Sequence, residues 1–245
     1  MGVSLEDMKV KRMPVNEQVF ESMRDAIKSG TWKPGERIPS EMELSSIFGV
    51  NRLTVRMAMQ RLIGMGLLDS RVGDGTYVKE FSFCDYMGRV SDFYLGPELL
   101  DKICEYRNVI EIESARLAVL RASSEEIAEL EAICQNFEEL KQDFLIRQEE
   151  SILMDIVRQD VEFHHKICEM SHNDLFVYAF EMARELLCTY MEITLKKRVR
   201  YWNSQKQKGV PWDDLHRVVL NSIKSRDFET CKKAYADMVD YKVDL

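Results

Sequence analysis

The sequence predicts a mainly α-helical protein in two parts, a small N-terminal domain of α+β type and an all-α antiparallel helical bundle. Three observations lead to this fold class. Residues 39–66 have the pattern of two short helices joined by a tight turn. Residues 67–78 have the pattern of a short β-hairpin with a glycine turn. From Glu98 onward, apolar residues recur at helical spacing almost throughout.

Length and composition exclude several classes of protein. The chain has 245 residues, of which 45% are hydrophobic and 31% are charged, as in ordinary soluble proteins. No apolar run approaches the length of a membrane span, and the N-terminus lacks the apolar core of a signal peptide. The six cysteines are scattered without a Cys-x-x-Cys pair, which is typical of free thiols in a reducing compartment. We therefore expect a cytoplasmic protein that contacts no membrane.

Charge is distributed unevenly along the chain. The net charge is −8, but residues 1–80 contain 12 Lys and Arg against 11 Asp and Glu, a net of +1. The acidic excess therefore lies in the remainder, and the first part is free to approach phosphates. A weakly positive domain would bind DNA through a few well-placed contacts, and a dimer would double their number.

Three helices are expected before the hairpin, over residues 15–29, 41–48 and 52–65. Ser40 and Glu43 have the spacing of a capping box, which opens the second of these helices. Gly49 tolerates the left-handed conformation that a sharp helix exit needs. Asn51 is a suitable N-cap for the third helix.

The third helix combines an apolar stripe with a cationic face. The stripe consists of Val55, Ala58, Met59 and Leu62. Arg52 and Arg56 lie four residues apart on another face, where their guanidinium groups could bind guanine edges or phosphates in a DNA major groove. The alternative is a solvated face with two ordinary arginines. The hairpin that follows completes a winged helix-turn-helix, which favours DNA binding.

The N-terminal motifs resemble those of GntR-type bacterial transcription regulators. The similarity is carried by the segments IPSEMEL (38–44), FGVNRLTVRMA (48–58) and GDGTYV (73–78). The resemblance implies that DNA is contacted by Asn51, Arg52, Thr54 and Arg56 and by the wing-tip residues Gly73 and Gly75. Three residues depart from the usual pattern: Asn51 replaces Ser or Thr, Met42 replaces an arginine, and Asp74 places an acid at the wing tip. These departures concern the strength and the sequence of the preferred operator.

The second domain is expected to contain about six helices, near residues 100–122, 124–140, 151–170, 174–200, 213–225 and 227–243. A further capping box, Ser123 with Glu126, opens the second of them, and Asp227 caps the last. Residues 81–95 are aromatic and irregular, so we interpret them as a connection that packs on one or both domains. The expected organisation is therefore a DNA-binding domain over 1–80, a linker over 81–96 and an effector-binding and dimerisation domain over 97–245.

Three side chains in the bundle have the chemistry of a divalent metal site. Asp160 and His164 lie four residues apart on one helix, so both can point at the same place, and His216 opens another helix. One carboxylate and two imidazoles are suitable ligands for Zn²⁺, Ni²⁺ or Mn²⁺. The alternative is a surface hydrogen bond or a histidine buried in the core, which this spacing produces more often.

The second domain resembles the FCD effector domain that accompanies the DNA-binding module in one branch of GntR regulators. The similarity is carried by EYRNVIE (105–111), DVEFH (160–164), SHNDL (171–175) and HRVVLNSIKSRD (216–227). The resemblance implies a metal bound by an Asp and three His, of which Asp160, His164 and His216 are present and Met238 replaces the fourth. It also implies that Arg107 faces the cavity and binds an effector carboxylate. A structural salt bridge from Arg107 to Glu111 is the alternative.

Together these features predict a homodimeric, ligand-responsive transcription regulator, most simply a repressor, and not an enzyme. Its partners would be a palindromic double-stranded operator and a small carboxylate effector such as an organic or sugar acid. Two alternatives remain open at this stage. One is an enzyme that holds a catalytic metal at Asp160, His164 and His216, and the other is a metal-free sensor of an apolar, acyl-type ligand.

Overall fold

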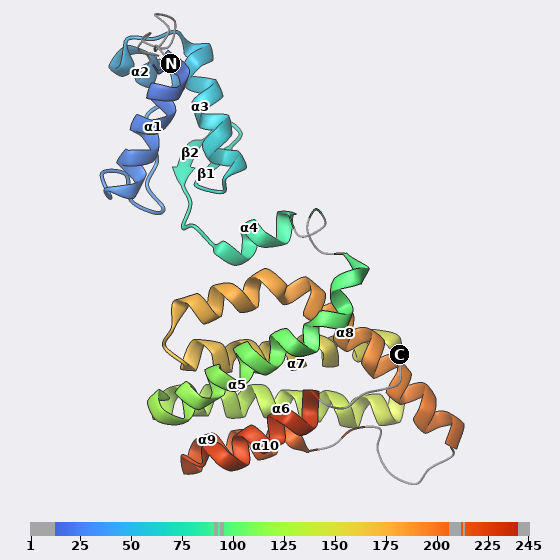
Figure 1. Cartoon of the computed structure of the whole chain (residues 1–245). Coiled ribbons are helices and arrows are strands. Elements are labelled where there is room, and N and C mark those ends of the chain that lie inside the picture. Colours follow the sequence, from blue (N-terminus) through green and yellow to red (C-terminus); the bar gives the residue numbers. More distant parts are fainter. Residues whose placement is uncertain (1–12, 91–92, 94–95, 206–211, 213, 240–245) are drawn as a thin grey trace, which may run out of the picture. The chain divides into compact units, whose positions relative to one another are not determined.

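The chain folds into a small N-terminal unit of helices with a hairpin and a larger all-helical unit (Figure 1). The computed structural model describes residues 13–90, 93, 96–205, 212 and 214–239. Within them the two compact units divide after Tyr86. These elements confirm the predicted fold class. The expected N-terminal tail, most of the loop expected over 203–209 and the end of the last expected helix lie outside the described residues.

The N-terminal unit packs three helices against a two-stranded sheet. The helices are α1 (Val15–Lys28), α2 (Glu41–Phe48) and α3 (Arg52–Gly64), and the antiparallel strands are β1 (Leu68–Arg71) and β2 (Gly75–Val78). One apolar cluster holds them together, and its largest fully buried members are Met23, Leu44 and Leu62. The expected apolar stripe of α3 is buried in this cluster.

The helix caps predicted from the sequence are present. Ser40 Oγ accepts a hydrogen bond from the Glu43 backbone at 3.3 Å, and the Glu43 carboxylate accepts one from the Ser40 backbone at 2.8 Å. Gly49 ends α2 in the left-handed conformation, with φ of 64°. Asn51 Oδ1 accepts from the Thr54 backbone at 2.8 Å. Since caps satisfy backbone groups that a helix end leaves open, they fix where α3 begins.

The segment between α1 and α2 lies along the hairpin. Arg37 forms an isolated antiparallel bridge with Tyr77, and Ile38 donates its backbone N–H to Thr76 at 2.9 Å. The expected edge strand at Ile38 is thus a short bridge. Gly75 has a φ of 144°, which L side chains rarely adopt, so this position of the wing favours glycine, and a Cβ atom there would also displace the Arg37 side chain, whose Nε lies 2.5 Å away.

In the part of the second unit that the structure describes, six helices form a bundle: α5 (Ile103–Arg121), α6 (Ser124–Arg147), α7 (Glu150–Met170), α8 (Asp174–Gln205), α9 (Leu215–Ser225) and α10 (Phe228–Val239). Two short elements precede it, α4 (Phe83–Val90) and a 3₁₀ helix over Pro97–Lys102. Three expectations differ from the structure. The connection contains a two-turn helix, and α6 continues seven residues beyond the expected Leu140. Helix α8 continues five residues beyond the expected Arg200, so residues 203–205 of the expected loop are helical.

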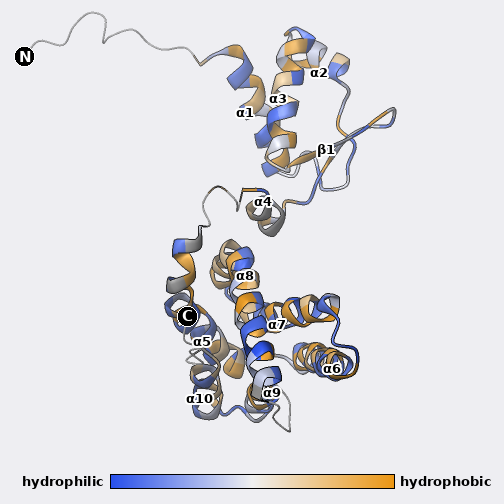
Figure 2. Ribbon diagram, turned by 90° about the vertical axis from the view of Figure 1, so that its right-hand side faces the viewer, coloured by the Kyte–Doolittle hydropathy of each residue, from blue (hydrophilic) through white to orange (hydrophobic). Residues whose placement is uncertain are grey.

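Helix α7 is the central element of the bundle. It contacts α5, α6 and α8, and its buried residues are distributed around most of its circumference. Hydrophobic and hydrophilic residues alternate around the helices of both units (Figure 2). Two polar residues of α7, Asp160 and His164, are nevertheless buried. Among the described residues, no helix combines the length and the apolar character needed to cross a bilayer.

Replacing Ser123 with alanine should destabilise the bundle by about 1 kcal/mol, because the first turn of α6 loses its side-chain cap. Denaturant unfolding of the full chain, followed by helical circular dichroism, measures the change. Ser124→Ala is the matched control, since Ser124 is exposed and lies within the helix. Equal stability of the two variants would contradict the capping assignment.

Candidate metal centre and nucleic-acid interface

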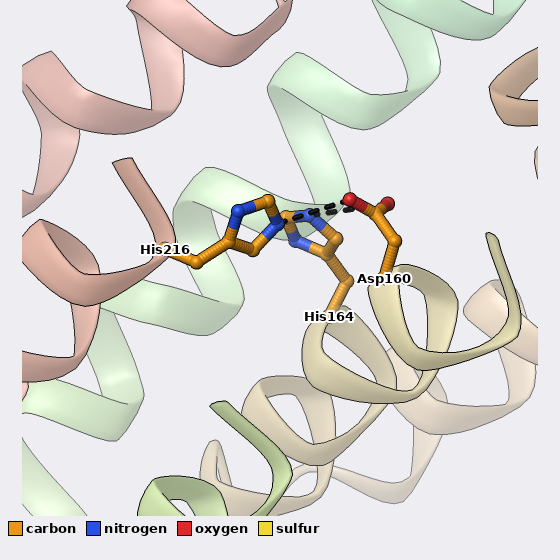
Figure 3. Close-up of side chains that lie close together, drawn as sticks. All are labelled: Asp160, His164 and His216. Atoms are coloured by element: carbon orange, nitrogen blue, oxygen red, sulfur yellow. Dashed lines mark ion pairs between the residues drawn. The ribbon is translucent and has the colours of Figure 1, made fainter. Parts of the chain in front are cut away.

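Asp160, His164 and His216 come together inside the second unit. Asp160 and His164 extend from successive turns of α7, and His216 is the second residue of α9. Both imidazoles point at the Asp160 carboxylate (Figure 3). His216 Nε2 lies 3.0 Å from Asp160 Oδ1, and His164 Nε2 lies 3.8 Å from Asp160 Oδ2. All three side chains are buried, so the four-residue spacing on α7 does not mark a surface hydrogen bond here.

This arrangement fits a divalent cation. The three ligand atoms lie within 4.8 Å of one another. Bonds of about 2.1 Å around one ion separate neighbouring ligand atoms by roughly 3.0–3.4 Å, so a small adjustment would complete the geometry. Among the described residues, Asp160 Oδ2 and both ring nitrogens of His216 lack a well-aligned hydrogen-bond partner. Buried polar atoms normally have partners, and a metal ligand role would account for Asp160 Oδ2 and for one ring nitrogen of His216.

Neighbouring side chains orient His164. Its Nδ1 lies 3.1 Å from Oε2 of Glu111 and 3.3 Å from the hydroxyl of Tyr235. A proton on Nδ1 shared with Glu111 leaves Nε2 as the lone-pair atom that faces Asp160. This is the way in which carboxylates orient metal-binding histidines in known sites. Tyr235 was not predicted as part of the site, because it has no sequence signal beyond its position on an apolar helix face.

The protonation states of these groups suit metal binding. Burial lowers the pKa of His164 to about 4, so its imidazole is neutral near pH 7. Burial alone would raise the pKa of Asp160, but the neighbouring His216, His164 and Arg107 outweigh it and hold that pKa well below its usual range. The centre therefore presents an ionised carboxylate and a neutral imidazole, the forms that bind metals.

Arg107 lies beside the centre and is paired with Glu111. Its guanidinium makes two hydrogen bonds to the Glu111 carboxylate, of 2.7 and 3.1 Å, and both side chains are buried. Its Nη2 also lies 3.4 Å from Nε2 of His164. The salt bridge considered as the alternative for Arg107 is therefore present. Arg107 is not among the residues that line the cavity next to the centre.

A small cavity opens beside two of the three candidate ligands, Asp160 and His216. Its remaining walls are aromatic and aliphatic with two cationic side chains, and consist of Phe137, Lys141, Ile156, Val157, Met191, Thr194, Leu195, Arg198 and Trp212. The sequence analysis missed Lys141. A signal was present, because this lysine is in register with the buried stripe of α6 formed by Leu130, Cys134, Phe137 and Phe144.

Met238, which stands at the position of a fourth ligand in the resembling family, packs against the apolar core of the bundle. The group of possible metal ligands among the described residues contains only Asp160, His164 and His216. Three protein ligands with one open position form the arrangement typical of sites that also bind a small molecule.

The residues expected to bind DNA lie together on α3 and the hairpin. Arg56 forms two hydrogen bonds to Glu41 on α2, of 2.8 and 2.7 Å, in an exposed ion pair. Thr54 Oγ1 donates to Asn51 Oδ1 at 3.0 Å, so both side chains take part in the cap of α3. Arg52 is exposed on the first turn. An exposed pair such as Arg56–Glu41 contributes little to stability and can open when a phosphate or base competes.

The wing tip is built from Gly73 and Gly75, whose φ angles are 77° and 144°. Asp74 between them accepts a hydrogen bond from the Tyr77 hydroxyl at 3.0 Å, and the guanidinium of Arg71 lies 4.3 Å above the Tyr77 ring. The acidic side chain at the tip is therefore held against the hairpin itself. Left-handed backbone at Gly73 explains why the turn requires glycine there.

Comparison with known families agrees with both units. Residues 15–78 match the family model "Bacterial regulatory proteins, gntR family", and residues 102–240 match the model "FCD domain". The second match alone covers more than half of the chain.

The chain is also similar to individual proteins over nearly its full length. It is 27% identical to the "Glc operon transcriptional activator" of Escherichia coli strain K12, covering 95% of this chain and 89% of that protein. It is 27% identical to the "HTH-type transcriptional repressor NanR" of Salmonella newport, covering 96% and 86%. A solved structure, "Streptococcus agalactiae GntR", shares the fold with a TM-score of 0.63 at 19% identity, covering 91% of this chain and 97% of that one.

Glu111→Ala should lower the free energy of unfolding by about 3–5 kcal/mol, because it leaves the Arg107 guanidinium buried without its carboxylate. The measurement is denaturant unfolding of the full chain. Glu113→Ala is the control on the same helix, where an exposed arginine pair is lost and little change is expected. A small effect at Glu111, similar to that at Glu113, would mean that the buried pair is not formed.

Proposed function

We propose the following function for this chain, which belongs to the gntR family of bacterial regulatory proteins and carries an FCD domain. Like its relatives, the chain is a DNA-binding transcription regulator and not an enzyme. It binds a palindromic operator as a homodimer, and a carboxylate effector in the FCD unit controls that binding. The cavity beside Asp160 and His216 is the observation on which this proposal depends.

On the DNA side, α3 enters the major groove and the hairpin follows the phosphate backbone. The contacts are assigned to Asn51, Arg52, Thr54 and Arg56 of the helix and its cap, and to Gly73 and Gly75 of the wing. Arg56 breaks its ion pair with Glu41 and contacts the DNA instead, which is possible because the pair is exposed. A homodimer follows from the partner, since a two-fold protein binds two half-sites of an inverted repeat.

On the effector side, Asp160, His164 and His216 hold a divalent ion, Zn²⁺, Ni²⁺ or Mn²⁺. Three observations support this: the ligand atoms converge, Asp160 Oδ2 and the His216 ring nitrogens lack well-aligned hydrogen-bond partners, and His164 is neutral. When bound, the ion would supply positive charge that attracts a carboxylate. Asp160, His164 and His216 would hold it beside the cavity.

The effector is a small organic or sugar acid. Its carboxylate binds at the metal end of the cavity, and the cationic side chains of Lys141 and Arg198 add further positive charge to the wall. The direct contact expected for Arg107 requires that its guanidinium leave Glu111. In its present position the Arg107 guanidinium lies next to His164, with Nη2 3.4 Å from His164 Nε2, and does not line the cavity.

A metal-free sensor of an apolar ligand is the second candidate, and one observation favours it. Most of the cavity wall is aliphatic or aromatic, including Phe137, Leu195 and Trp212. Such a wall suits an acyl chain as well as the carbon part of an organic acid. The metal content of the purified chain separates the two candidates.

Regulation is proposed to be repression that the effector relieves. Relatives of this chain bear the names of both an activator and a repressor, so the direction needs its own test. A reporter behind the operator should be silent with the protein and active when the effector is added. Effector and operator binding should weaken each other by the same factor, because thermodynamic coupling is reciprocal.

The full chain should retain about one Zn²⁺ per subunit after loading and dialysis, and His164→Ala and His216→Ala should each lose it. Elemental analysis of the purified variants measures this. His172→Ala is the control, because His172 is exposed at the α7–α8 corner and interacts with Glu126. Stoichiometric metal in both site variants would remove these residues from the centre, and a metal-free wild type would favour the apolar-ligand sensor.

Arg52→Ala and Arg56→Ala should each weaken operator binding roughly tenfold to a hundredfold while leaving the fold intact, because both guanidinium groups are exposed on α3. The measurement is fluorescence anisotropy with the duplex that the wild type selects from a random pool, at fixed salt. Arg116→Ala on α5 removes the same charge far along the chain and serves as the control. Unchanged affinity in both α3 variants would reject α3 as the recognition helix.

A further inference from the structure

The centre of the outward face of α3 is apolar. Val55 lies in the buried face of this helix, and Leu53 and Met57 lie two residues before and after it. At 3.6 residues per turn, each of these two side chains points about 160° away from Val55 around the helix axis. Leu53 is 63% exposed and Met57 is 48% exposed. The side of α3 farthest from the core therefore presents two aliphatic side chains.

Arg56 and Arg61 lie on the two flanks of this face, and the exposed Gln60 lies between Arg56 and the middle of the face. On one flank, Arg56 is held by Glu41 of α2. On the other, the guanidinium of Arg61 lies 3.7 Å above the ring of Phe20 and pairs with Glu17 of α1. These two arginines thus turn toward neighbouring helices, and Leu53 and Met57 occupy the middle of the face.

From this arrangement we propose that Leu53, with Met57 one turn further on, recognises the C5 methyl group of thymine in the operator. The inference depends on the proposed binding of α3 in the major groove. The thymine methyl is the apolar group that a base pair presents in that groove, and aliphatic side chains contact it. A leucine cannot hydrogen-bond to a base, so it distinguishes bases by this methyl.

Position on the helix distinguishes Leu53 from the other exposed apolar residues of this unit. Single exposed apolar side chains are common and need no function, and Ile47 on α2 is 67% exposed. In a helix-turn-helix, however, the first residues of the second helix contact base edges, while the first helix crosses the backbone. Leu53 is the second residue of α3, whereas Ile47 is near the end of α2.

The test removes the methyl group and nothing else. The full-length wild type selects its preferred duplex from a random pool, and each thymine is then replaced in both half-sites by deoxyuridine, which pairs with adenine in the same way. At one position per half-site the wild type should bind the uracil duplex about tenfold more weakly, since each buried carbon contributes roughly a fourfold effect. Leu53→Ala should bind both duplexes equally, and Ile47→Ala should keep the wild-type ratio. Met57→Ala should abolish the difference in affinity between the thymine and uracil duplexes at a thymine next to the one that Leu53 contacts.

Each result has a definite meaning. Equal binding of thymine and uracil duplexes by the wild type at every position overturns the inference, as does a selected half-site without thymine. A full wild-type ratio in Leu53→Ala also overturns it. If the wild type selects no duplex over random DNA, the proposed operator binding fails instead, so the two failures are distinguishable.

Discussion

The second unit depends on the placement of ionisable groups in a buried part of its core. Glu111 and Asp160 bring two carboxylates, and Arg107 brings one guanidinium. Glu111, Asp160 and Arg107 alone set two negative charges against one positive charge, which is costly in an apolar interior unless other charges lie nearby. Lys141 and Arg198 in the adjacent cavity wall bring positive charge near Asp160. The proposed ion would add positive charge at this carboxylate, and a carboxylate effector would offset part of it.

This requirement explains why α7 occupies the middle of the bundle. Its position allows Glu111 and Arg107 of α5, His216 of α9 and Tyr235 of α10 to meet side chains from a single helix. Four helices are thereby linked through Asp160 and His164. A ligand that enters beside Asp160 acts on all of them at once. Such shared contacts are the physical means by which a small molecule can shift an equilibrium between two packed states.

Local patterns in the sequence predicted local structure well. They predicted fewer of the contacts between residues that are distant in the sequence. The capping boxes at Ser40 and Ser123 confirm that cap chemistry marks helix starts. Convergence of Asp160 and His164 followed from helical spacing. His216, 52 residues later, was grouped with them by its ligand chemistry and by the family resemblance, because spacing alone cannot show that two distant helices meet. The sequence did not decide whether Arg107 pairs with Glu111 or with an effector, because residue spacing does not show which side chains are buried. Lys141 was not predicted as a cavity residue, because a lysine within an apolar stripe does not show by itself that it faces a cavity. The length of α6 was underestimated, since its polar second half gives no sharp stop signal.

The weak charge of the N-terminal unit affects how such a regulator can be controlled. Twelve basic and eleven acidic residues over 1–80 give little general attraction to phosphates, and pairs such as Arg56–Glu41 reduce it further. Binding by one such unit is therefore expected to depend on a few well-fitted contacts. Stable occupation of a DNA site is expected to require two units that act together. When affinity depends on simultaneous engagement, a change in the relative geometry of two units removes most of it. In the proposed homodimer, an effector that contributes only about 1–3 kcal/mol of coupling would release the operator, because neither half-site alone would retain the protein.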